Sequence, residues 1–160
     1  MAPTTPYTPD LNGREPIEAI RDTASRIEAL TASWTADDYQ RSYAAGKWTA
    51  RQILIHLTQT ELALGTRARM ALSTPHYAAQ SFDQDSWMTR EAGLSGGDAR
   101  HAYVTLSRLN ANLFGGLSAA DRQTPFSHPE YGALTVDWII HQTAGHQIHH
   151  LHHLQTIARG

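Results

Sequence analysis

Six of the ten histidines in this 160-residue chain lie within thirteen positions near its C-terminus: His141, His146, His149, His150, His152 and His153. In two pairs, His146 with His150 and His149 with His153, the partners are four residues apart. On a helix this spacing places both side chains on one face, with Cβ atoms about 5–6 Å apart. Two imidazoles so placed can bind one metal ion at about 2.0–2.1 Å each. The spacing therefore predicts a metal site on a helix.

A helical wheel for residues 138–158 distinguishes the two pairs. The apolar positions of this stretch fill about a third of the circle. His146 and His150 border the apolar arc, so we expect them to be half-buried. His149 and His153 lie closer to the polar face, and we expect them, like His152, to be in solvent.

A third ligand has to come from elsewhere in the chain, and His56 is the candidate. It lies between Ile55 and Leu57 in a second predicted helix, and a buried imidazole requires a polar partner. A metal ion would be such a partner. The alternative is a histidine that is hydrogen-bonded within the core, and the residue pattern alone leaves both interpretations open.

Four helical stretches would position these residues, because apolar side chains recur at helical spacing in each. They are predicted at about residues 16–33, 49–72, 98–115 and from 134 or 135 to the end. Thr49 and Gln52 form a capping box for the second, and Asp98 is the expected N-cap of the third. Residues 1–14 are predicted to be an extended lead-in. Residues 35–47 are predicted to form a short turn plus a loop, and residues 73–97 and 118–134 to be loops without strands. The sequence thus predicts one all-α domain over residues 1–160, a four-helix bundle whose longest connection joins the second and third helices.

Composition narrows the classes of function. The chain has 41% hydrophobic residues, a formal net charge of -2 and no cysteine. We expect neither nucleic acid nor a membrane as partner, because there is no basic field and no apolar run near the roughly 20 residues of a membrane span. The first residues lack the features of a secretory signal, so we expect a cytoplasmic protein. The lack of cysteine excludes thiolate metal ligands and a cysteine nucleophile.

Two segments carry a resemblance to a known family. The metal-binding segments of the DinB/YfiT-like superfamily of four-helix proteins resemble two stretches of this chain, GKWTARQILIHLTQTE (46–61) and DWIIHQTAGHQIHHLHHLQTI (137–157). Two further stretches resemble the stress-protein-like branch of that superfamily: FDQDSW (82–87) and RLNANLF (108–114). The resemblance implies an up-down-down-up bundle, a divalent ion held by His56, His146 and His150, and frequently a homodimer. Known members include thiol S-transferases that use bacillithiol or mycothiol, a mycothiol-dependent maleylpyruvate isomerase, and proteins without an assigned reaction.

Three imidazoles leave a coordination position open, as in catalytic metal sites. Zinc, nickel, cobalt and iron(II) all accept such ligands, and the sequence does not choose among them.

A hydrolase would require a carboxylate as general base, and the candidate, Glu61, lies about 140° around the helix from His56. A thiol suits a protein without cysteine better, because the metal would deprotonate a small-molecule thiol. Arg67, Arg69 and Trp87 are candidates for substrate binding, although arginines in solvent and tryptophans in a core are common without that role.

The leading hypothesis is a metal-dependent thiol S-transferase or related detoxification enzyme that acts on a small-molecule substrate. A metal-dependent hydrolase is the second enzyme hypothesis. A non-catalytic stress protein that binds a metal or a small ligand is the third. A ferritin-like di-iron protein is disfavoured, because the paired Glu-x-x-His motifs of that class are missing.

Overall fold

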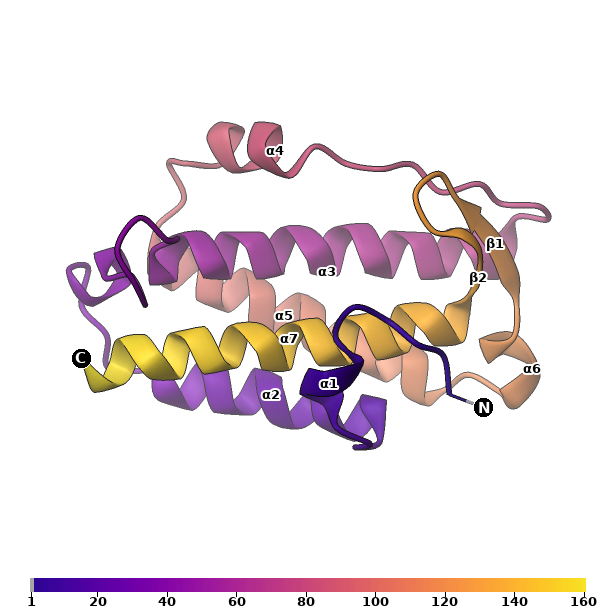
Figure 1. Cartoon of the computed structure of the whole chain (residues 1–160), viewed down its shortest axis with the longest axis horizontal. Coiled ribbons are helices and arrows are strands. Elements are labelled where there is room, and N and C mark those ends of the chain that lie inside the picture. Colours follow the sequence, from indigo (N-terminus) through magenta and orange to yellow (C-terminus); the bar gives the residue numbers. More distant parts are fainter. Residues whose placement is uncertain (1) are drawn as a thin grey trace.

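The computed structural model describes residues 2–160, and four long helices lie side by side in it (Figure 1): α2 (Pro16–Leu30), α3 (Ala50–Ser73), α5 (Gly96–Gly115) and α7 (Val136–Arg159). Both α2 and α3 pack against α5 and α7, so the predicted four-helix bundle is confirmed. The colours in Figure 1 show that α3 and α5 run in one direction while α2 and α7 run in the other. The topology is therefore up-down-down-up.

The long connection between α3 and α5 follows from this topology. Because the two helices are parallel, the chain has to return along the bundle before α5 begins (Figure 1). The 24 residues of α3 correspond to about 36 Å at 1.5 Å per residue. The connection covers that distance outside α3 and contains a short helix, α4 (Gln84–Arg90), which the sequence did not predict. Asp83 begins this helix by accepting a hydrogen bond from the backbone N–H of Ser86.

Between α5 and α7 the chain forms a short helix, α6 (Ala119–Arg122), and a β-hairpin, where the sequence predicted a loop without strands. Strand β1 (Pro125–His128) pairs antiparallel with β2 (Gly132–Thr135). In β1, Phe126 and His128 are buried and the residues before each are exposed, which is the two-residue period of a strand. Four residues are too short a stretch for this period to stand out beside the prolines and glycine that predicted a loop.

The N-terminal segment and one helix start also differ from the prediction. Thr8–Leu11 form a helical turn, α1, within the expected extended lead-in, and Leu11 is buried in the core. A 3-10 turn, η1 (Asp38–Gln40), lies within residues 35–47, in agreement with the short turn and loop predicted there. Helix α5 starts at Gly96, ahead of the predicted cap, because the side chain of Ser95 accepts the backbone N–H of Asp98. Asp98 therefore lies within the first turn.

The interior contains two apolar clusters with buried polar side chains between them. One cluster includes Leu64 and Phe114, and the other includes Leu54 and Tyr103. Helices α3, α5 and α7 each interrupt their apolar stripe between the two clusters. The buried polar residues at these interruptions, which we call the polar layer, are His56, Glu61, Ser107, Asn110, His146, Gln147 and His150. The fold thus brings most of the chemistry-bearing side chains to the middle of the bundle.

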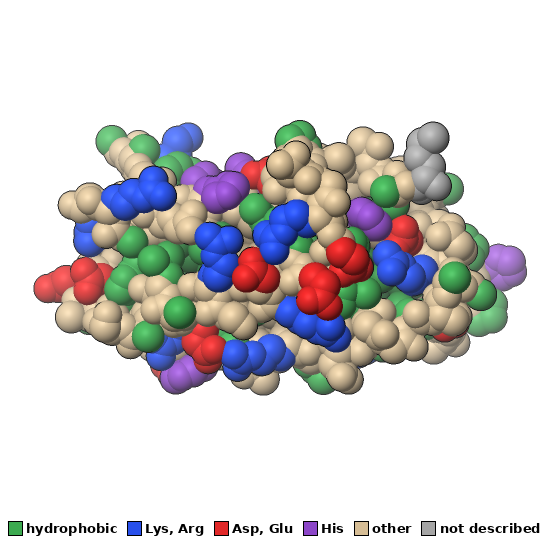
Figure 2. Space-filling view, turned by 90° about the horizontal axis from the view of Figure 1, so that it is seen from below, with side chains coloured by type: hydrophobic (Ala, Val, Ile, Leu, Met, Phe, Trp, Pro, Cys, Tyr) green, Lys and Arg blue, Asp and Glu red, His purple; other side chains and the backbone are tan. Residues whose placement is uncertain are grey.

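The charged surface near α2 is mixed in sign. Arg14 and Arg26 pair with Asp22, and Arg108 of α5 pairs with Glu28. Figure 2 shows acidic and basic side chains interspersed on the face that it presents, so that face offers no field of a single sign. Within residues 2–160, no helix combines the length and the apolarity that crossing a membrane would require.

Candidate metal centre

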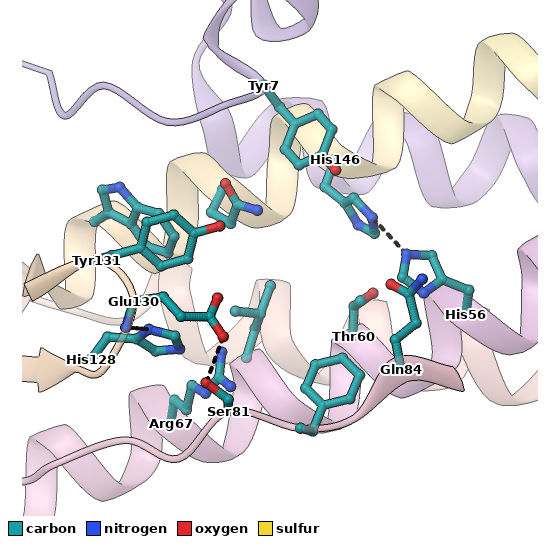
Figure 3. A pocket seen from close by; sticks show the side chains of 14 residues that line it. Tyr7, His56, Thr60, Arg67, Ser81, Gln84, His128, Glu130, Tyr131 and His146 are labelled. Atoms are coloured by element: carbon teal, nitrogen blue, oxygen red, sulfur yellow. Dashed lines mark hydrogen bonds between the residues drawn. The ribbon is translucent and has the colours of Figure 1, made fainter. Parts of the chain in front are cut away.

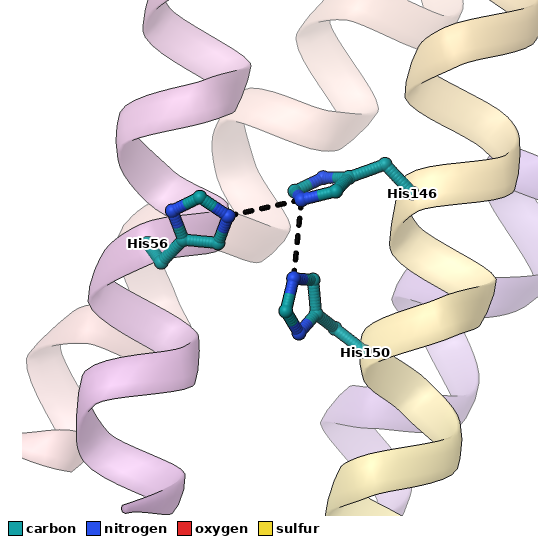
Figure 4. A group of neighbouring side chains, drawn as sticks. All are labelled: His56, His146 and His150. Carbon is teal, nitrogen blue, oxygen red and sulfur yellow. Dashed lines mark hydrogen bonds between the residues drawn. The ribbon is translucent and has the colours of Figure 1, made fainter. Parts of the chain in front are cut away.

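His56 lies on α3, His146 and His150 lie on α7, and the packing of these two helices brings the three imidazoles together (Figure 4). Nε2 of His146 lies 2.9 Å from Nε2 of His56 and 3.1 Å from Nε2 of His150. Figure 4 shows the three rings meeting between the helices. One nitrogen from each ring lies within 4.8 Å of the other two. The structure therefore gathers the three sequence-predicted ligands into one cluster, which we call the histidine trio.

Local sequence fixes where each of the two helices begins. Thr49 and Gln52 form the predicted capping box at the start of α3, each side chain accepting the other's backbone N–H. Thr135 caps α7 by accepting the backbone N–H of Trp138. His146 and His150 then follow one turn apart on α7, at the side that packs against α3.

The nitrogen positions of the trio fit a cation better than a set of hydrogen bonds. A neutral imidazole has one N–H and one lone pair, so Nε2 of His146 can satisfy only one of the two ring nitrogens that it faces. A cation binds the lone pairs of all three rings. Tetrahedral bonds of about 2.0–2.1 Å would place the nitrogens about 3.3 Å apart, close to the observed spacing. Three imidazoles suit zinc, nickel, cobalt or iron(II).

Burial keeps the three imidazoles in the form that binds metals. Their exposed fractions are 5%, 4% and 6% for His56, His146 and His150. Burial lowers the pKa of His56 to about 4. Burial also lowers the pKa of His146 and His150 well below the ordinary value, and the neighbouring imidazoles add to this effect. The rings are therefore neutral at pH 7 and each offers a lone pair.

Two neighbouring side chains hold the trio from outside. The ring of Trp48 lies with its centroid 4.8 Å from that of His56. Nδ1 of His150 lies 3.4 Å from Nδ1 of His153. In this orientation His150 can donate its N–H to His153 and keep the Nε2 lone pair for a metal. A hydrogen bond from the other ring nitrogen is the usual way in which a histidine ligand is oriented.

His149 and His153 are half-buried and therefore less exposed than the helical wheel predicted, although 39% of the His149 side chain remains in solvent. Nδ1 of His149 lies 3.4 Å from the carboxylate of Asp10, which belongs to α1. The ring of His153 stacks on Tyr43 at 3.9 Å between centroids. These covering residues come from segments that the sequence predicted only as lead-in and loop. His152 is exposed, as predicted.

One side of the trio forms part of the wall of a pocket of about 230 Å³ (Figure 3). His56 and His146 line this pocket, and Tyr7, Thr60 and Gln84 lie near them (Figure 3). The other end of the pocket is lined by Arg67, Ser81, His128, Glu130 and Tyr131. A small molecule in this pocket would therefore reach a cation held by the trio.

Glu61, the general base considered from the sequence, does not line this pocket. Its side chain is 2% exposed, and its carboxylate accepts hydrogen bonds from Asn110 at 2.7 Å and from Gln147. The amide of Gln147 also donates to Ser107 at 3.1 Å. Burial raises the pKa of Glu61 to about 7, against the effect of its two hydrogen bonds. Glu61 is therefore part of the polar layer that joins α3, α5 and α7.

The structure separates the three substrate-binding candidates. Arg67 lines the pocket. Arg69 donates to the side chain of Asn110 at 2.8 Å and to the carbonyl of Gly65, and so connects α3 with α5. Trp87 lines a neighbouring hollow of about 320 Å³ and packs on Phe82 at 4.7 Å between centroids.

Several pocket residues were not singled out from the sequence. Tyr7 reaches the trio because the N-terminal segment passes close to Gly145, where an added Cβ would lie 2.5 Å from the carbonyl oxygen of Tyr7. Its ring lies 5.0 Å from that of His146. A glycine inside a helix is a known sign of close approach, so Gly145 was the available signal. Glu130 and Tyr131 belong to the hairpin turn, which the sequence did not predict.

Removal of the metal is expected to leave the fold in place. Both apolar clusters exist independently of the trio, so a bound ion adds stability by linkage and does not nucleate folding. After chelation we expect the helical circular dichroism signal to stay near its starting value and the melting temperature to fall by about 5–10 °C, as about 2.7 kcal/mol of linkage gives in a chain of this size. Added zinc should reverse the shift. A coil spectrum after chelation would instead identify a structural metal.

Comparisons with known proteins agree on the family and on the fold. Residues 19–154 match the DinB superfamily. A "putative metal-dependent hydrolase" of Oceanobacillus iheyensis is 25% identical over 150 residues, which cover 89% of this chain and 84% of that protein. A protein of the same description from Halalkalibacterium halodurans is 24% identical over 140 residues, with 87% and 82% covered. The structure of YfiT from Bacillus subtilis, described as a "probable metal-dependent hydrolase with an unusual four-helix bundle topology", superposes with a TM-score of 0.81 at 18% identity and covers 90% of this chain and 84% of its own.

Proposed function

The chain belongs to the DinB superfamily, and from this premise we propose that it is a metal-dependent enzyme in which His56, His146 and His150 hold one divalent cation. The observation that carries the proposal is the convergence of three buried Nε2 atoms beside a pocket. A cation bound there would supply a Lewis acid that lowers the pKa of a nucleophile entering from the pocket.

We favour a small-molecule thiol as that nucleophile, which makes the protein a thiol S-transferase or a related detoxification enzyme. A hydrolase requires a base that accepts a proton from water. Glu61 is sealed in the polar layer and bonded to Asn110 and Gln147, so it does not serve that role in the pocket. A thiol deprotonated by a cation requires no separate base. Since the chain has no cysteine, the thiol would be a co-substrate of the bacillithiol or mycothiol type.

In the proposed reaction the thiol sulfur forms a bond to an electrophilic carbon, the leaving group departs with its bonding electron pair, and the thiol proton passes to solvent. The protein contributes position. Thr60 and Gln84 offer hydrogen-bonding groups near His56, and Trp138 gives the wall an apolar surface. Burial raises the pKa of Tyr7, so its phenol stays protonated and can donate a hydrogen bond to a leaving group.

A metal-dependent hydrolase is the second candidate, and two observations favour it. The relatives from Oceanobacillus and Halalkalibacterium carry that description. Glu130 also lines the pocket and is exposed there, so a carboxylate is present to accept a proton from a substrate or a water in that region.

Cobalt-substituted protein tests the choice between the two. If a thiol binds at the trio, adding it should produce a sulfur-to-cobalt charge-transfer band in the near ultraviolet, which the protein alone cannot give because it has no cysteine. Binding should release about one proton per thiol at neutral pH. The same samples should accelerate consumption of monochlorobimane, and His146→Ala should abolish the band and the activity.

The panel consists of bacillithiol, mycothiol, glutathione and cysteine. If none of the four thiols gives a charge-transfer band or turnover, the transferase proposal is contradicted. Turnover of an ester or amide panel by the same metal-loaded protein would then support the hydrolase.

A further inference from the structure

We propose that the end of the pocket remote from the trio binds a substrate group that carries a carboxylate and an ammonium side by side, with Arg67 holding the first and Glu130 the second. The proposal rests on the proposed function and adds a substrate class to it. Molecules of this class include α-amino acids and conjugates that end in one.

One stripe of α3 connects the two ends of the pocket. His56, Thr60, Leu64 and Arg67 all line it, at intervals of four, four and three residues. Eleven residues are three helical turns, so His56 and Arg67 lie on the same face about 16 Å apart along the axis. A substrate group held at Arg67 therefore stays within the same pocket as a reactive group at the trio.

Arg67 keeps an unneutralised charge in this pocket. Its Nη2 donates to the carbonyl of Gln80 at 2.6 Å, and the guanidinium lies 6.0 Å from the ring centroid of Phe82. The guanidinium is half-buried, which lowers its pKa, while nearby Tyr77, Glu130 and Tyr131 act in the opposite direction. In the described part of the chain no carboxylate oxygen lies within 4.0 Å of it. The planar guanidinium fork is suited to a carboxylate.

Glu130 presents the opposite charge from the hairpin turn. Its Oε1 accepts a hydrogen bond from Ser81 at 2.8 Å, and its backbone N–H donates to Nδ1 of His128 at 3.2 Å, so both the side chain and the turn are held. Figure 3 shows the carboxylate directed into the pocket beside Arg67. Across residues 2–160 it has no cationic partner within 4.0 Å.

The two charges together select among ligands. A ligand with only a carboxylate would be attracted by Arg67 but repelled by Glu130. A ligand with only an ammonium would be attracted by Glu130 but repelled by Arg67. A zwitterionic group satisfies both partners at once, and opposite charges in contact near a protein surface attract each other. The simpler alternative is that Arg67 and Glu130 close on each other and bind nothing.

Three thioethers separate these alternatives without requiring thiol chemistry: S-methylcysteine, which carries both charges, 3-(methylthio)propionate, which carries the carboxylate, and 2-(methylthio)ethylamine, which carries the ammonium. Their binding to zinc-loaded, full-length, ¹⁵N-labelled protein would be measured from amide chemical shifts. We expect S-methylcysteine to shift the amides around Ser81 and Glu130 saturably, with a Kd about tenfold lower than that of either singly charged analogue.

Arg67→Gln and Glu130→Gln should each weaken S-methylcysteine binding about tenfold, which is the effect of about 1.4 kcal/mol. Arg26→Gln, at an exposed ion pair on α2, is the matched control and should have no effect. Equal affinity for the three thioethers, or unchanged binding of S-methylcysteine in both pocket variants, would overturn the proposal. Since none of the probes has a free thiol, failure of the transferase reaction would not affect this result.

Discussion

Replacing His56, His146 or His150 singly with alanine is expected to remove most of the metal that the protein retains. In the proposed site each of these side chains supplies one of three nitrogen ligands, and their nearest Nε2 distances are 2.9 and 3.1 Å. Two remaining imidazoles hold a divalent ion much more weakly than three, because the lost bond is replaced by water. We expect metal content, measured by elemental analysis of untagged protein after dialysis, to fall from about one ion per chain to near background in all three variants.

The remaining histidines of α7 provide graded controls. His152 is exposed and outside the trio, so His152→Ala should retain the full metal content. His153 faces the Nδ1 of His150, so His153→Ala should bind one ion at saturating metal but with about 10–100-fold lower affinity, the usual cost of losing an outer partner of a ligand. Loss of metal on replacing His149 and His153, with retention in the trio variants, would place the site on the other face of α7.

The trio could be identified from the sequence because each of its members lies on a long helix with a clear apolar period. Their position beside the apolar arc of α7 distinguished His146 and His150 from the second i, i+4 pair, and the position of His56 among apolar residues of α3 identified the partner helix. Helical geometry is local, and it is therefore readable from a single sequence. The contact between α3 and α7 is not local, and it was supplied by the family resemblance.

The substrate end of the pocket could not be predicted, because it is built by segments with little local signal. Glu130 and Tyr131 stand in the turn between two four-residue strands, and Tyr7 belongs to an N-terminal segment that is held by tertiary contacts with α7. Arg67 and Arg69 could not be distinguished from the sequence either, although they differ by 200° around α3. Their roles differ only through tertiary contacts, because Arg67 lines the pocket whereas Arg69 donates a hydrogen bond to Asn110 of α5.

Replacing Glu61 with glutamine is expected to remove a contribution to the free energy of unfolding that falls as the pH rises. Burial raises the pKa of this carboxyl from 4.5 to about 7 in the folded chain. Between these two values the folded state keeps a proton that the unfolded state has released, so the free energy of unfolding falls as the pH rises. At about 1.4 kcal/mol per pKa unit the decline amounts to at most about 3 kcal/mol, and it is complete above pH 7. Below pH 4.5 both states are protonated and the contribution of Glu61 no longer changes.

Glutamine keeps the size of the side chain and removes its titration. Asn110 and Gln147 each donate to Glu61, and the Oε1 of Gln147 has no hydrogen-bond partner among the described residues. By rotating its amide, Gln147 can accept a hydrogen bond from the new amide group and can still bond to Ser107, whose hydroxyl both donates and accepts, so residue 61 keeps both of its partners in the variant. Relative to the wild type, Glu61→Gln should become more stable by up to about 3 kcal/mol as the pH rises from 4.5 to 8.

Urea denaturation of both proteins at pH 5, 6, 7 and 8 measures this difference. Chelator is present throughout, so that metal binding to the trio does not contribute, and titration of the trio itself is common to both proteins and cancels. Glu18→Gln, whose carboxylate is exposed on α2, is the matched control and should follow the wild type at every pH. Parallel curves for the wild type and Glu61→Gln would mean that the carboxyl of Glu61 titrates at the same pH in the folded and unfolded chain, and that burial in the polar layer does not hold its proton.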